Sequence, residues 1–565
     1  MKFINTPSTR LALLADNSIQ LLSREIKSQA DFAKLNVEIF ESDYGQINQV
    51  INDSLSPLYE FCPTLITILH SVEVMREEFY RLPLADRYQF SIKKIAELQD
   101  LISTINQNLP DARVIVSNLA ELQDGIYGNG ANKYANSFLY AIRKYNLSLM
   151  ELAQNNGNLH VLDIALLQSL IGRERFYDPR LYVNASMSFS VDSHEPIAKN
   201  IIDLVRVFQG GAKKCLILDL DNTLWGGIIG DDGVEKIEVG DLGQGKSFTL
   251  LQCWAKELKE RGVLLAICSK NTESVAKEPF ISHPDMHLRL EDIAVFVANW
   301  EDKASNIRKI QESLNIGFDS MVFIDDNRFE RELVRSLLPT VTVPEMPEDP
   351  AEYLNYLESL NLFEAGILSV LDRDRTTLIQ TELERKKMEG QFTNPKDFLK
   401  NLEMKAILSK FNKFNTPRIA QLSERSNQYN LRTIRYSEQD IQNISQDPNY
   451  MGIAVSLGDR LGDHGLIAVV VLRQEVDTLF IENWLMSCRV LKRGVEHVTL
   501  NKIVALAREK GCKRIKGEYL PTKKNALVEN HFQDLNFQDL GGGFWGLEVT
   551  NHQCGEHFIE VTSDE

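Results

Sequence analysis

The sequence of 565 residues predicts a multidomain α/β protein. At about 150 residues per domain, this length corresponds to three or four domains. Over the first 360 residues, short apolar runs alternate with helical patterns, which is typical of sheets layered with helices. The last third instead has longer strand runs followed by a helix, which predicts a mixed sheet. We therefore expect an α/β domain at 1–205, a second at 206–360, a helical linker at 361–395 and a mixed-sheet α/β domain at 396–565.

The first domain combines short buried strands with long helices. The expected strands are Leu11–Leu14, Leu65–Leu69, Arg113–Val116 and His160–Ile164. The stretch Leu84–Leu109 has helical spacing and ends before Pro110, which cannot continue a helix. The glycine-rich stretch Gly125–Ala135 is predicted to be a surface loop.

The second domain has the clearest pattern. From Lys214 the apolar runs CLIL, VLLAIC, IAVFVA and MVFI are short and continuous, with helical segments between them. Such runs are typical of a parallel sheet that is buried on both faces. The run VTV at Val341–Val343 would add a fifth strand, which Pro344 ends.

The third domain follows a charged helical stretch that runs from Pro350 to about Gly390. Its strongest strand predictions are Leu466–Leu472 and Thr478–Trp484, and a helix is expected over His497–Lys510. The tail, HQCGEHFIEVTSDE, is predicted to hold a last strand.

Composition excludes several function classes. The formal net charge of −17 argues against nucleic acid as the main partner, because phosphate binding needs a basic field. No apolar run approaches the about 20 residues that a membrane-spanning helix needs, and the first residues do not resemble a signal peptide. The seven cysteines are scattered and form no CxxC pair. We therefore expect a cytoplasmic protein without a zinc ribbon.

Two carboxylates follow the first strand of the second domain, as Asp219 and Asp221. Residues i and i+2 of a strand point the same way, so the two side chains are expected to meet at the carboxyl end of a buried strand. Ligands of α/β sheets bind at that end. Because adjacent anions repel, a divalent cation or a shared proton is expected, and oxygen ligands suit Mg²⁺.

The later strands end in matching chemistry. VLLAIC is followed by Ser269, Lys303 follows IAVFVA, and MVFI is followed by Asp325 and Asp326. Taken singly, paired acids after a strand are also common in calcium and sugar-nucleotide sites, and a lysine after a strand is usually solvated. Together and in this order, these groups indicate one phosphoryl-transfer site. Only 50 positions separate Asp219 from Ser269 and 34 separate Ser269 from Lys303, which leaves no room for a large cap domain.

This order of motifs resembles the haloacid dehalogenase (HAD) superfamily of phosphatases and phosphotransferases. The resemblance implies that Asp219 is the nucleophile and that Asp221 is the general acid and base. Asp219, Asp221 (through its carbonyl), Asp325 and Asp326 would hold Mg²⁺. Ser269 and Lys303 would bind the transferring phosphoryl group.

The loop after Thr478–Trp484 resembles the pyrophosphate-binding loop of the GNAT N-acetyltransferase fold. It reads Arg489-Val490-Leu491-Lys492-Arg493-Gly494, with Lys492 where the family has its first glycine. Backbone amides at a helix N-terminus favour phosphate groups. The resemblance implies that Arg489, Arg493 and Gly494 bind CoA or the phosphopantetheine arm of a carrier protein.

The motifs WGGIIGDDG, ICSKN, FIDDN, QLSERSNQYNL, DRLGDHGLIA and WLMSCRVLKRGVE, in this order, resemble the FkbH-like family over residues 1–545. That family joins a degenerate SGNH-hydrolase-like domain to a HAD phosphatase domain with a minimal cap and a GNAT-like domain. The SGNH motif GDS is replaced here by Ala15-Asp16-Asn17-Ser18. The resemblance implies a glyceryltransferase that dephosphorylates 1,3-bisphosphoglycerate and loads an acyl carrier protein for polyketide-type biosynthesis. A plain Mg²⁺-dependent phosphatase of small phosphate esters and a CoA- or carrier-dependent acyltransferase stay open as alternatives.

Glyceryl loading through the enzyme needs a thiolate. Cys488 lies among cationic residues that would lower its pKa, whereas Cys268 adjoins Ser269 and could point into the core. We expect the thioester at one of these two, with Cys488 ahead. His464 and His497 are candidate bases, although lone histidines are more often structural. Nine basic and three acidic residues between Arg385 and Arg418 form either a carrier-docking face or a solvated helix and linker.

Overall fold

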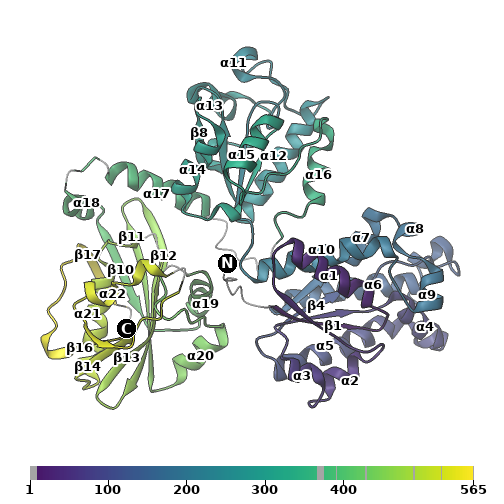
Figure 1. Cartoon of the computed structure of the whole chain (residues 1–565), viewed down its shortest axis with the longest axis horizontal. Helices are drawn as coiled ribbons and strands as arrows, with labels where there is room; N and C mark the ends of the chain where they lie inside the picture. The colour runs from purple at the N-terminus through teal and green to yellow at the C-terminus, as the bar shows by residue number, and fades with distance from the viewer. Residues whose placement is uncertain are drawn as a thin grey trace. The chain divides into compact units, whose positions relative to one another are not determined.

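A computed structural model provides the structure of the chain, and it describes residues 9–364, 375–389, 391–392, 394–426, 429–487, 490–522 and 525–563. The chain divides into two compact units, Met1–Arg373 and Asp374–Glu565. Three sheets organise these units, two in the first and one in the second (Figure 1). The predicted multidomain α/β architecture is confirmed.

The N-terminal domain is built on a parallel sheet of order β2-β1-β3-β4-β5. Its strands are β1 (Thr9–Ala15), β2 (Val37–Glu41), β3 (Leu65–Leu69), β4 (Arg113–Ser117) and β5 (Leu159–Leu162). Its helices are α1 (Gln20–Phe32), α2 (Ile47–Asn52), α3 (Pro57–Phe61), α4 (Val72–Arg81), α5 (Phe90–Asn108), α6 (Phe138–Gln154), α7 (Ile164–Ile171), α8 (Arg173–Phe176), α9 (Pro179–Ala185) and α10 (Val191–Phe208). Figure 1 shows α1 and α10 on one face of the sheet and α2 and α5 on the other.

Two details of this domain differ from the sequence prediction. The edge strand β2 was not expected, because its half-buried residues lack a continuous apolar run. The strand predicted over His160–Ile164 ends earlier, since the Asp163 side chain accepts a hydrogen bond from Leu166 N and caps α7.

The second domain has a four-stranded parallel sheet of order β8-β7-β6-β9. Its strands are β6 (Cys215–Leu218), β7 (Leu264–Ser269), β8 (Ile293–Ala298) and β9 (Met321–Ile324). Its helices are α11 (Ile229–Asp232), α12 (Gly245–Glu260), α13 (Glu273–Ser282), α14 (Lys303–Leu314), α15 (Arg328–Leu337) and α16 (Tyr353–Ser359). The four predicted strands are confirmed.

The expected fifth strand at Val341–Val343 is wrong. Thr342 forms only an isolated bridge with Val322 of β9, through Phe323 N to Thr342 O (2.9 Å) and Thr342 N to Met321 O (3.0 Å). Pro344 follows and has no N–H to extend the pairing. Between β6 and α12, the described chain holds the one-turn α11 and two isolated backbone bridges, Asp221–Trp225 and Gly226–Glu238. This small cap segment, residues 219–244, agrees with a minimal cap.

The second unit is a mixed eight-stranded sheet of order β15-β16-β14-β13-β12-β11-β10-β17. Its strands are β10 (Met404–Ser409), β11 (Tyr450–Asp459), β12 (Gly462–Glu475), β13 (Thr478–Met486), β14 (Arg514–Glu518), β15 (Gln538–Gly541), β16 (Phe544–Glu548) and β17 (Ile559–Ser563). Its helices are α17 (Arg375–Glu389), α18 (Pro395–Asn401), α19 (Thr416–Arg425), α20 (Glu438–Gln446), α21 (Val495–Glu509) and α22 (His531–Asp534). The pairs β13–β14 and β10–β17 are parallel, and the others are antiparallel.

The helix α17 falls in this second unit, because the chain divides between residues 373 and 374. The expected linker at 361–395 is therefore not a separate element: its second half contacts the mixed-sheet domain. Among the described helices, none is both long and apolar enough to cross a membrane.

Candidate active site

The four predicted groups of the phosphoryl site converge at one edge of the β8-β7-β6-β9 sheet. Asp219 directly follows β6, Ser269 is the last residue of β7, and Asp325 directly follows β9. Lys303 is the first residue of α14, which begins after β8. Because parallel strands end at the same edge, residues more than 100 positions apart in sequence lie within contact distance.

Lys303 joins the two central carboxylates. Its Nζ lies 2.9 Å from Asp219 Oδ2 and also forms an ion pair with Asp325. The Lys303 side chain is only 3% exposed and that of Asp325 is fully buried. Burial lowers the pKa of Lys303, but the two carboxylates outweigh it and hold the pKa above its usual value. Burial and the neighbouring Asp219 raise the pKa of Asp325 to about 7.

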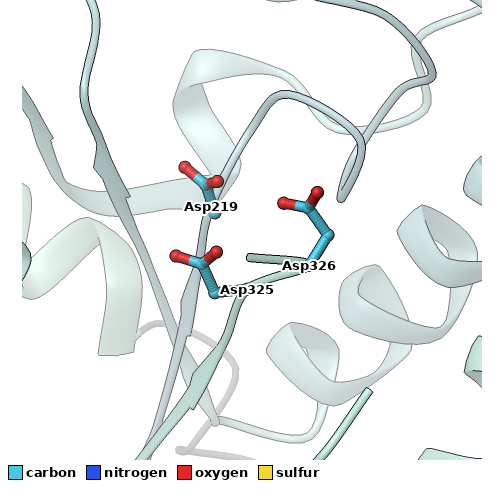
Figure 2. Close-up of side chains that lie close together, drawn as sticks. All are labelled: Asp219, Asp325 and Asp326. Carbon is cyan, nitrogen blue, oxygen red and sulfur yellow. The ribbon is translucent and has the colours of Figure 1, made fainter. Parts of the chain in front are cut away.

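Three carboxylates form a potential cation site (Figure 2). Oxygens of Asp219, Asp325 and Asp326 lie within 4.8 Å of one another. One lysine offsets only one of these three negative charges, and burial together with Asp219 raises the pKa of Asp326 as well. A divalent cation would relieve this repulsion, and an all-carboxylate set suits Mg²⁺ better than Zn²⁺. The residues present therefore fit the predicted magnesium site.

The Asp221 carboxylate is not part of that cluster. It accepts hydrogen bonds from Trp225 Nε1 (3.0 Å) and Ile229 N (3.0 Å) in the small cap segment, and Asn271 Nδ2 lies 3.4 Å away. The strand ends at Leu218 and Asn222 has a φ of 54°, so strand alternation does not apply here. Burial raises the pKa of Asp221, which favours the protonated form that a general acid needs. Metal binding through its carbonyl stays a prediction.

Two supporting residues were not expected from the sequence. Arg331 on α15 is 4% exposed, and its Nη1 donates to the carbonyl oxygens of Asp325 (2.9 Å) and Asp326 (2.6 Å). Thr223 Oγ1 accepts a hydrogen bond from Asp326 N (3.2 Å). These contacts fix the backbone of the acidic pair. In the sequence, the only sign of Arg331 is its position on the first turn after FIDDN.

Ser269 is buried at the end of β7, as expected for a residue that lines the site. Its neighbour Lys270 forms an ion pair with Glu330, with Nζ 2.6 Å from Oε1. Asn271 is also buried and adjoins Asp221.

The structure argues against Cys268 as the thioester residue. Its thiol has no solvent exposure and donates to the carbonyl of Lys303, with Sγ and O 3.7 Å apart. Burial strongly raises its pKa, so the thiol stays protonated. The other candidate, Cys488, lies outside the described residues, as does Arg489 of the expected cofactor loop.

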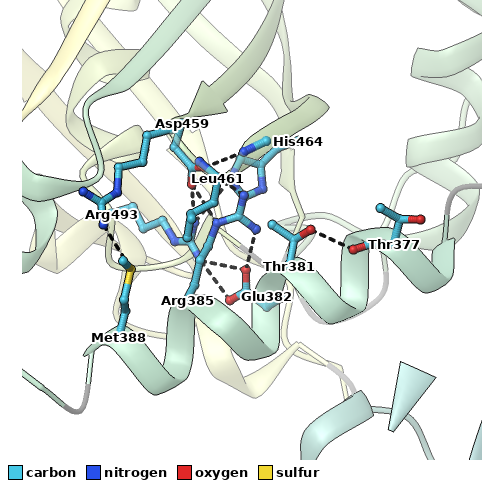
Figure 3. Close-up of polar contacts among 11 residues, drawn as sticks. Thr377, Thr381, Glu382, Arg385, Met388, Asp459, Leu461, His464 and Arg493 are labelled. Atoms are coloured by element: carbon cyan, nitrogen blue, oxygen red, sulfur yellow. Dashed lines mark hydrogen bonds and ion pairs between the residues drawn. The ribbon is translucent and has the colours of Figure 1, made fainter. Parts of the chain in front are cut away.

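Arg493 is part of a buried charge network with α17 (Figure 3). Its Nη2 donates to both carboxylate oxygens of Glu382, at 2.8 and 3.0 Å. Its Nη1 lies 3.3 Å from His464 Nε2. Gly494 directly precedes α21 as its N-cap and has a φ of 89°, a left-handed conformation that glycine adopts readily. The guanidinium of Arg493 is thus engaged within the domain rather than free for a cofactor.

Asp459 is the centre of this network. Its side chain is fully buried and accepts two hydrogen bonds from Arg385, at 2.7 and 2.8 Å. His464 Nε2 lies 3.0 Å from it. Arg385 is therefore buried within the domain and belongs neither to a carrier-docking face nor to a solvated helix surface. His464 lies between two charged partners, Asp459 and Arg493. These contacts do not suit His464 as a free general base.

Comparisons with known proteins agree with this architecture. The family described as FkbH, N-terminal domain, matches residues 10–206. The crystal structure of the N-terminal part of a Bacteroides fragilis protein that contains a phosphatase domain, complexed with Mg, is 45% identical, with a TM-score of 0.62. The match covers 64% of this chain and 95% of that chain. The search of curated proteins found no match.

Two acetyltransferase structures match part of this chain at low similarity. A ribosomal-protein-S18-alanine N-acetyltransferase from Escherichia coli is 13% identical, with a TM-score of 0.21. The match covers 26% of this chain and 94% of that chain. The GNAT domain of PAT from S. lividans is 19% identical, with a TM-score of 0.21. The match covers 25% of this chain and 89% of that chain. The match to the FkbH N-terminal domain and the 45% identity to the phosphatase-domain structure together show that the chain belongs to the FkbH-like family.

Proposed function

We propose that this protein is a magnesium-dependent HAD-type phosphatase that also loads a glyceryl group from 1,3-bisphosphoglycerate, or a similar acyl phosphate, onto an acyl carrier protein. The observation that carries the proposal is the cluster of Asp219, Asp325 and Asp326 around buried Lys303 at the strand ends. The family and the Mg-complexed relative support the phosphatase chemistry. The glyceryl step rests on the resemblance to the family.

The two phosphates of such a substrate have different fates. At the phosphate ester, an oxygen of Asp219 attacks phosphorus and the bond to the alkoxide oxygen breaks, giving an aspartyl phosphate. Asp221 donates a proton to the leaving oxygen, then accepts one from the water that hydrolyses the intermediate. Lys303 offsets the negative charge of Asp219 throughout. Mg²⁺ held by Asp219, Asp325 and Asp326 would supply the positive charge that lets a carboxylate approach a phosphate.

The acyl phosphate must react at carbon instead. A thiolate that attacks the acyl carbon expels inorganic phosphate and keeps the acyl group activated as a thioester, whereas attack at phosphorus would release an unactivated carboxylate. Of the two cysteines expected for this step, Cys268 is buried and stays protonated. We therefore assign the thioester to Cys488, from which the glyceryl group passes to the phosphopantetheine thiol of the carrier.

Arg493 bears on the alternative of a CoA-dependent acyltransferase. The residue that would meet the pyrophosphate is paired with Glu382. This favours a carrier protein over free CoA as the acyl acceptor, because carrier recognition does not require a free cation at this position.

The test is intact-protein mass spectrometry of the full chain with Mg²⁺, 1,3-bisphosphoglycerate generated in situ and a holo acyl carrier protein from the same gene neighbourhood. We expect a glyceryl-sized mass gain on the carrier, together with phosphate release. Asp219→Asn should stop hydrolysis of the phosphate ester, and Cys488→Ala should stop loading. The matched control is Asp231→Asn, an exposed acid on the small cap segment.

The other outcomes separate the alternatives. Phosphate release without a mass gain on enzyme or carrier would identify a plain phosphatase, and small phosphate esters would then be screened. Acyl transfer that needs CoA and no carrier would identify the acyltransferase alternative.

A further inference from the structure

The two neighbouring acids after β9 both reach the same cation site. One oxygen each of Asp219, Asp325 and Asp326 lies within 4.8 Å of the other two (Figure 2). Neighbouring residues of an extended strand point to opposite faces of the sheet, so a continued strand would send one of these two carboxylates away. The strand instead ends at Ile324, and the chain bends at Asp326. The geometry of the site therefore depends on the contacts that hold this bend.

Arg331 of α15 holds the bend through its carbonyl groups. Its Nη1 donates to the carbonyl oxygens of both Asp325 (2.9 Å) and Asp326 (2.6 Å), so one nitrogen fixes two successive peptide groups. On the amide side, Asp326 N donates to Thr223 Oγ1 at 3.2 Å. Arg331 is 4% exposed, so little water competes for its hydrogen bonds. Because a guanidinium is planar and rigid, the positions of these carbonyls follow the position of Arg331.

Arg331 is in turn held by a residue outside the site. Its Nε and Nη2 both donate to Glu345 Oε2, at 3.2 and 2.9 Å. Arg335, one helical turn further along α15, forms an ion pair with the same carboxylate, and its Nε and Nη2 donate to the Val343 carbonyl at 3.1 and 2.9 Å. The Glu345 side chain is 56% exposed. The segment predicted to be a fifth strand therefore anchors two arginines of α15, and through Arg331 it reaches the acids of the site.

Cations differ in how strictly they depend on such positioning. Mg²⁺ requires near-ideal octahedral geometry with oxygens at about 2.0–2.1 Å, whereas Ca²⁺ accepts oxygens at about 2.3–2.6 Å in flexible arrangements. A bend that is held on both its carbonyl and its amide side keeps the two carboxylates in fixed places, which favours the smaller and stricter cation. If the bend loosens, the affinity for Mg²⁺ should therefore fall more than the affinity for Ca²⁺.

We infer that Arg331 is a positioning residue that makes the phosphatase site selective for Mg²⁺ over larger cations, because it holds the bend that brings Asp325 and Asp326 to one cation. Its guanidinium contacts the backbone of the two acids rather than their carboxylates, so Arg331 acts through them. Glu345 sets the position of Arg331 from the protein surface. This role rests on the magnesium site of the proposed function and adds to it a preference among cations.

The test is isothermal titration calorimetry of the full chain with Mg²⁺ and with Ca²⁺, after EDTA treatment and dialysis and without any substrate. We expect the wild type to bind Mg²⁺ more tightly than Ca²⁺. Arg331→Lys keeps the positive charge but loses the fork that joins the two carbonyls to Glu345. Changes to groups that orient metal ligands typically cost about 10–100-fold in affinity, and we expect a rise of that size in the Kd for Mg²⁺. The Kd for Ca²⁺ should rise less, so the preference for Mg²⁺ falls. Glu345→Gln should act in the same direction with a smaller effect.

Two exposed residues on the same helix supply matched controls. Arg328→Lys matches Arg331→Lys at an exposed arginine, and Glu332→Gln matches Glu345→Gln at an exposed acid that pairs with Arg335. Both controls should bind the two cations like the wild type. Circular dichroism shows whether each variant is folded. If Arg331→Lys is not folded, Glu345→Gln decides the question, because its side chain is half-exposed and its loss is tolerated more easily.

The titrations also show when this role is wrong. Wild-type Kd values in Arg331→Lys, or in Glu345→Gln where Arg331→Lys does not fold, would overturn the inference. Equal rises in the two Kd values, or a wild type that prefers Ca²⁺, would overturn it as well. The proposed function can fail separately: a wild type that binds Mg²⁺ with the expected preference but releases no phosphate would refute the phosphatase and leave the role of Arg331 intact. A wild type that binds no Mg²⁺ would refute both.

Discussion

Replacing Lys303 with methionine tests whether the buried lysine is the cation that holds the phosphatase site together. Methionine keeps most of the length of the side chain and removes its charge. Without Lys303, three carboxylates would face one another with no cation among the described side chains that contact them. We expect the variant to be destabilised in EDTA and largely restored by Mg²⁺, because the metal ion would replace the missing charge.

The magnitude follows from the Lys303–Asp219 distance. At 2.9 Å and an effective dielectric constant of about 20, one such pair contributes about 6 kcal/mol of Coulomb energy. Part of this is offset because Lys303 no longer has to be desolvated. Removing one partner of a buried ion pair typically costs about 3–5 kcal/mol, and we expect a loss of that size in the free energy of unfolding without Mg²⁺.

Hydrogen exchange measured by mass spectrometry assigns this loss to the right domain, through peptides that cover β6 and β9. The control is Lys309→Met, which removes a half-exposed lysine paired with Glu301. Such surface pairs contribute about 0–1 kcal/mol, so the control should match the wild type. The reasoning would be refuted if Lys303→Met kept wild-type protection in EDTA, or if Mg²⁺ stabilised variant and wild type equally.

Three further predictions concern the second unit. Arg385→Met should destabilise it by about 3–5 kcal/mol in urea unfolding, because Asp459 stays buried without its main partner, and adding Asp459→Asn should recover part of the loss. Gly517→Ala would place a Cβ 2.3 Å from Phe532 Cζ and should cost about 1–3 kcal/mol, whereas Gly458→Ala, with no atom closer than 4.0 Å, should cost less. Burial lowers the pKa of His531 to about 3. The unfolded side chain therefore takes up a proton below about pH 6.5 while the folded one does not, so stability should fall between that pH and about 3, and His531→Asn should flatten this dependence in acid titrations followed by circular dichroism.

The phosphatase site could be predicted because its residues follow four apolar runs. Asp219, Ser269 and Asp325 each stand at the end of a buried strand, where the sheet itself brings them together. The orientation of Asp221 could not be predicted in the same way. It lies beyond the last strand residue, and its direction is set by the turn at Asn222 and by the donors of the cap segment.

The α17 network could not be predicted from local patterns. Arg385 and Asp459 are 74 positions apart, and Glu382 and Arg493 are 111 apart. In the sequence Arg385 is one of several basic residues in a charged stretch, so nothing local distinguishes it from its solvated neighbours. Only the packing of α17 on the β11–β12 end of the sheet makes it a buried ion-pair partner.

The parallel pairing of β17 with β10 has a consequence for how the second unit is made. Met404 of β10 pairs with Ile559, so residues separated by most of this unit lie side by side. During synthesis the β10 edge stays unpaired until residue 563 has left the ribosome. An open edge strand is a template for pairing with other chains. We therefore expect the nascent second unit to need protection from aggregation until β17 has been synthesised. Fusion partners that hinder the pairing of β17 with β10 should lower the yield of folded protein.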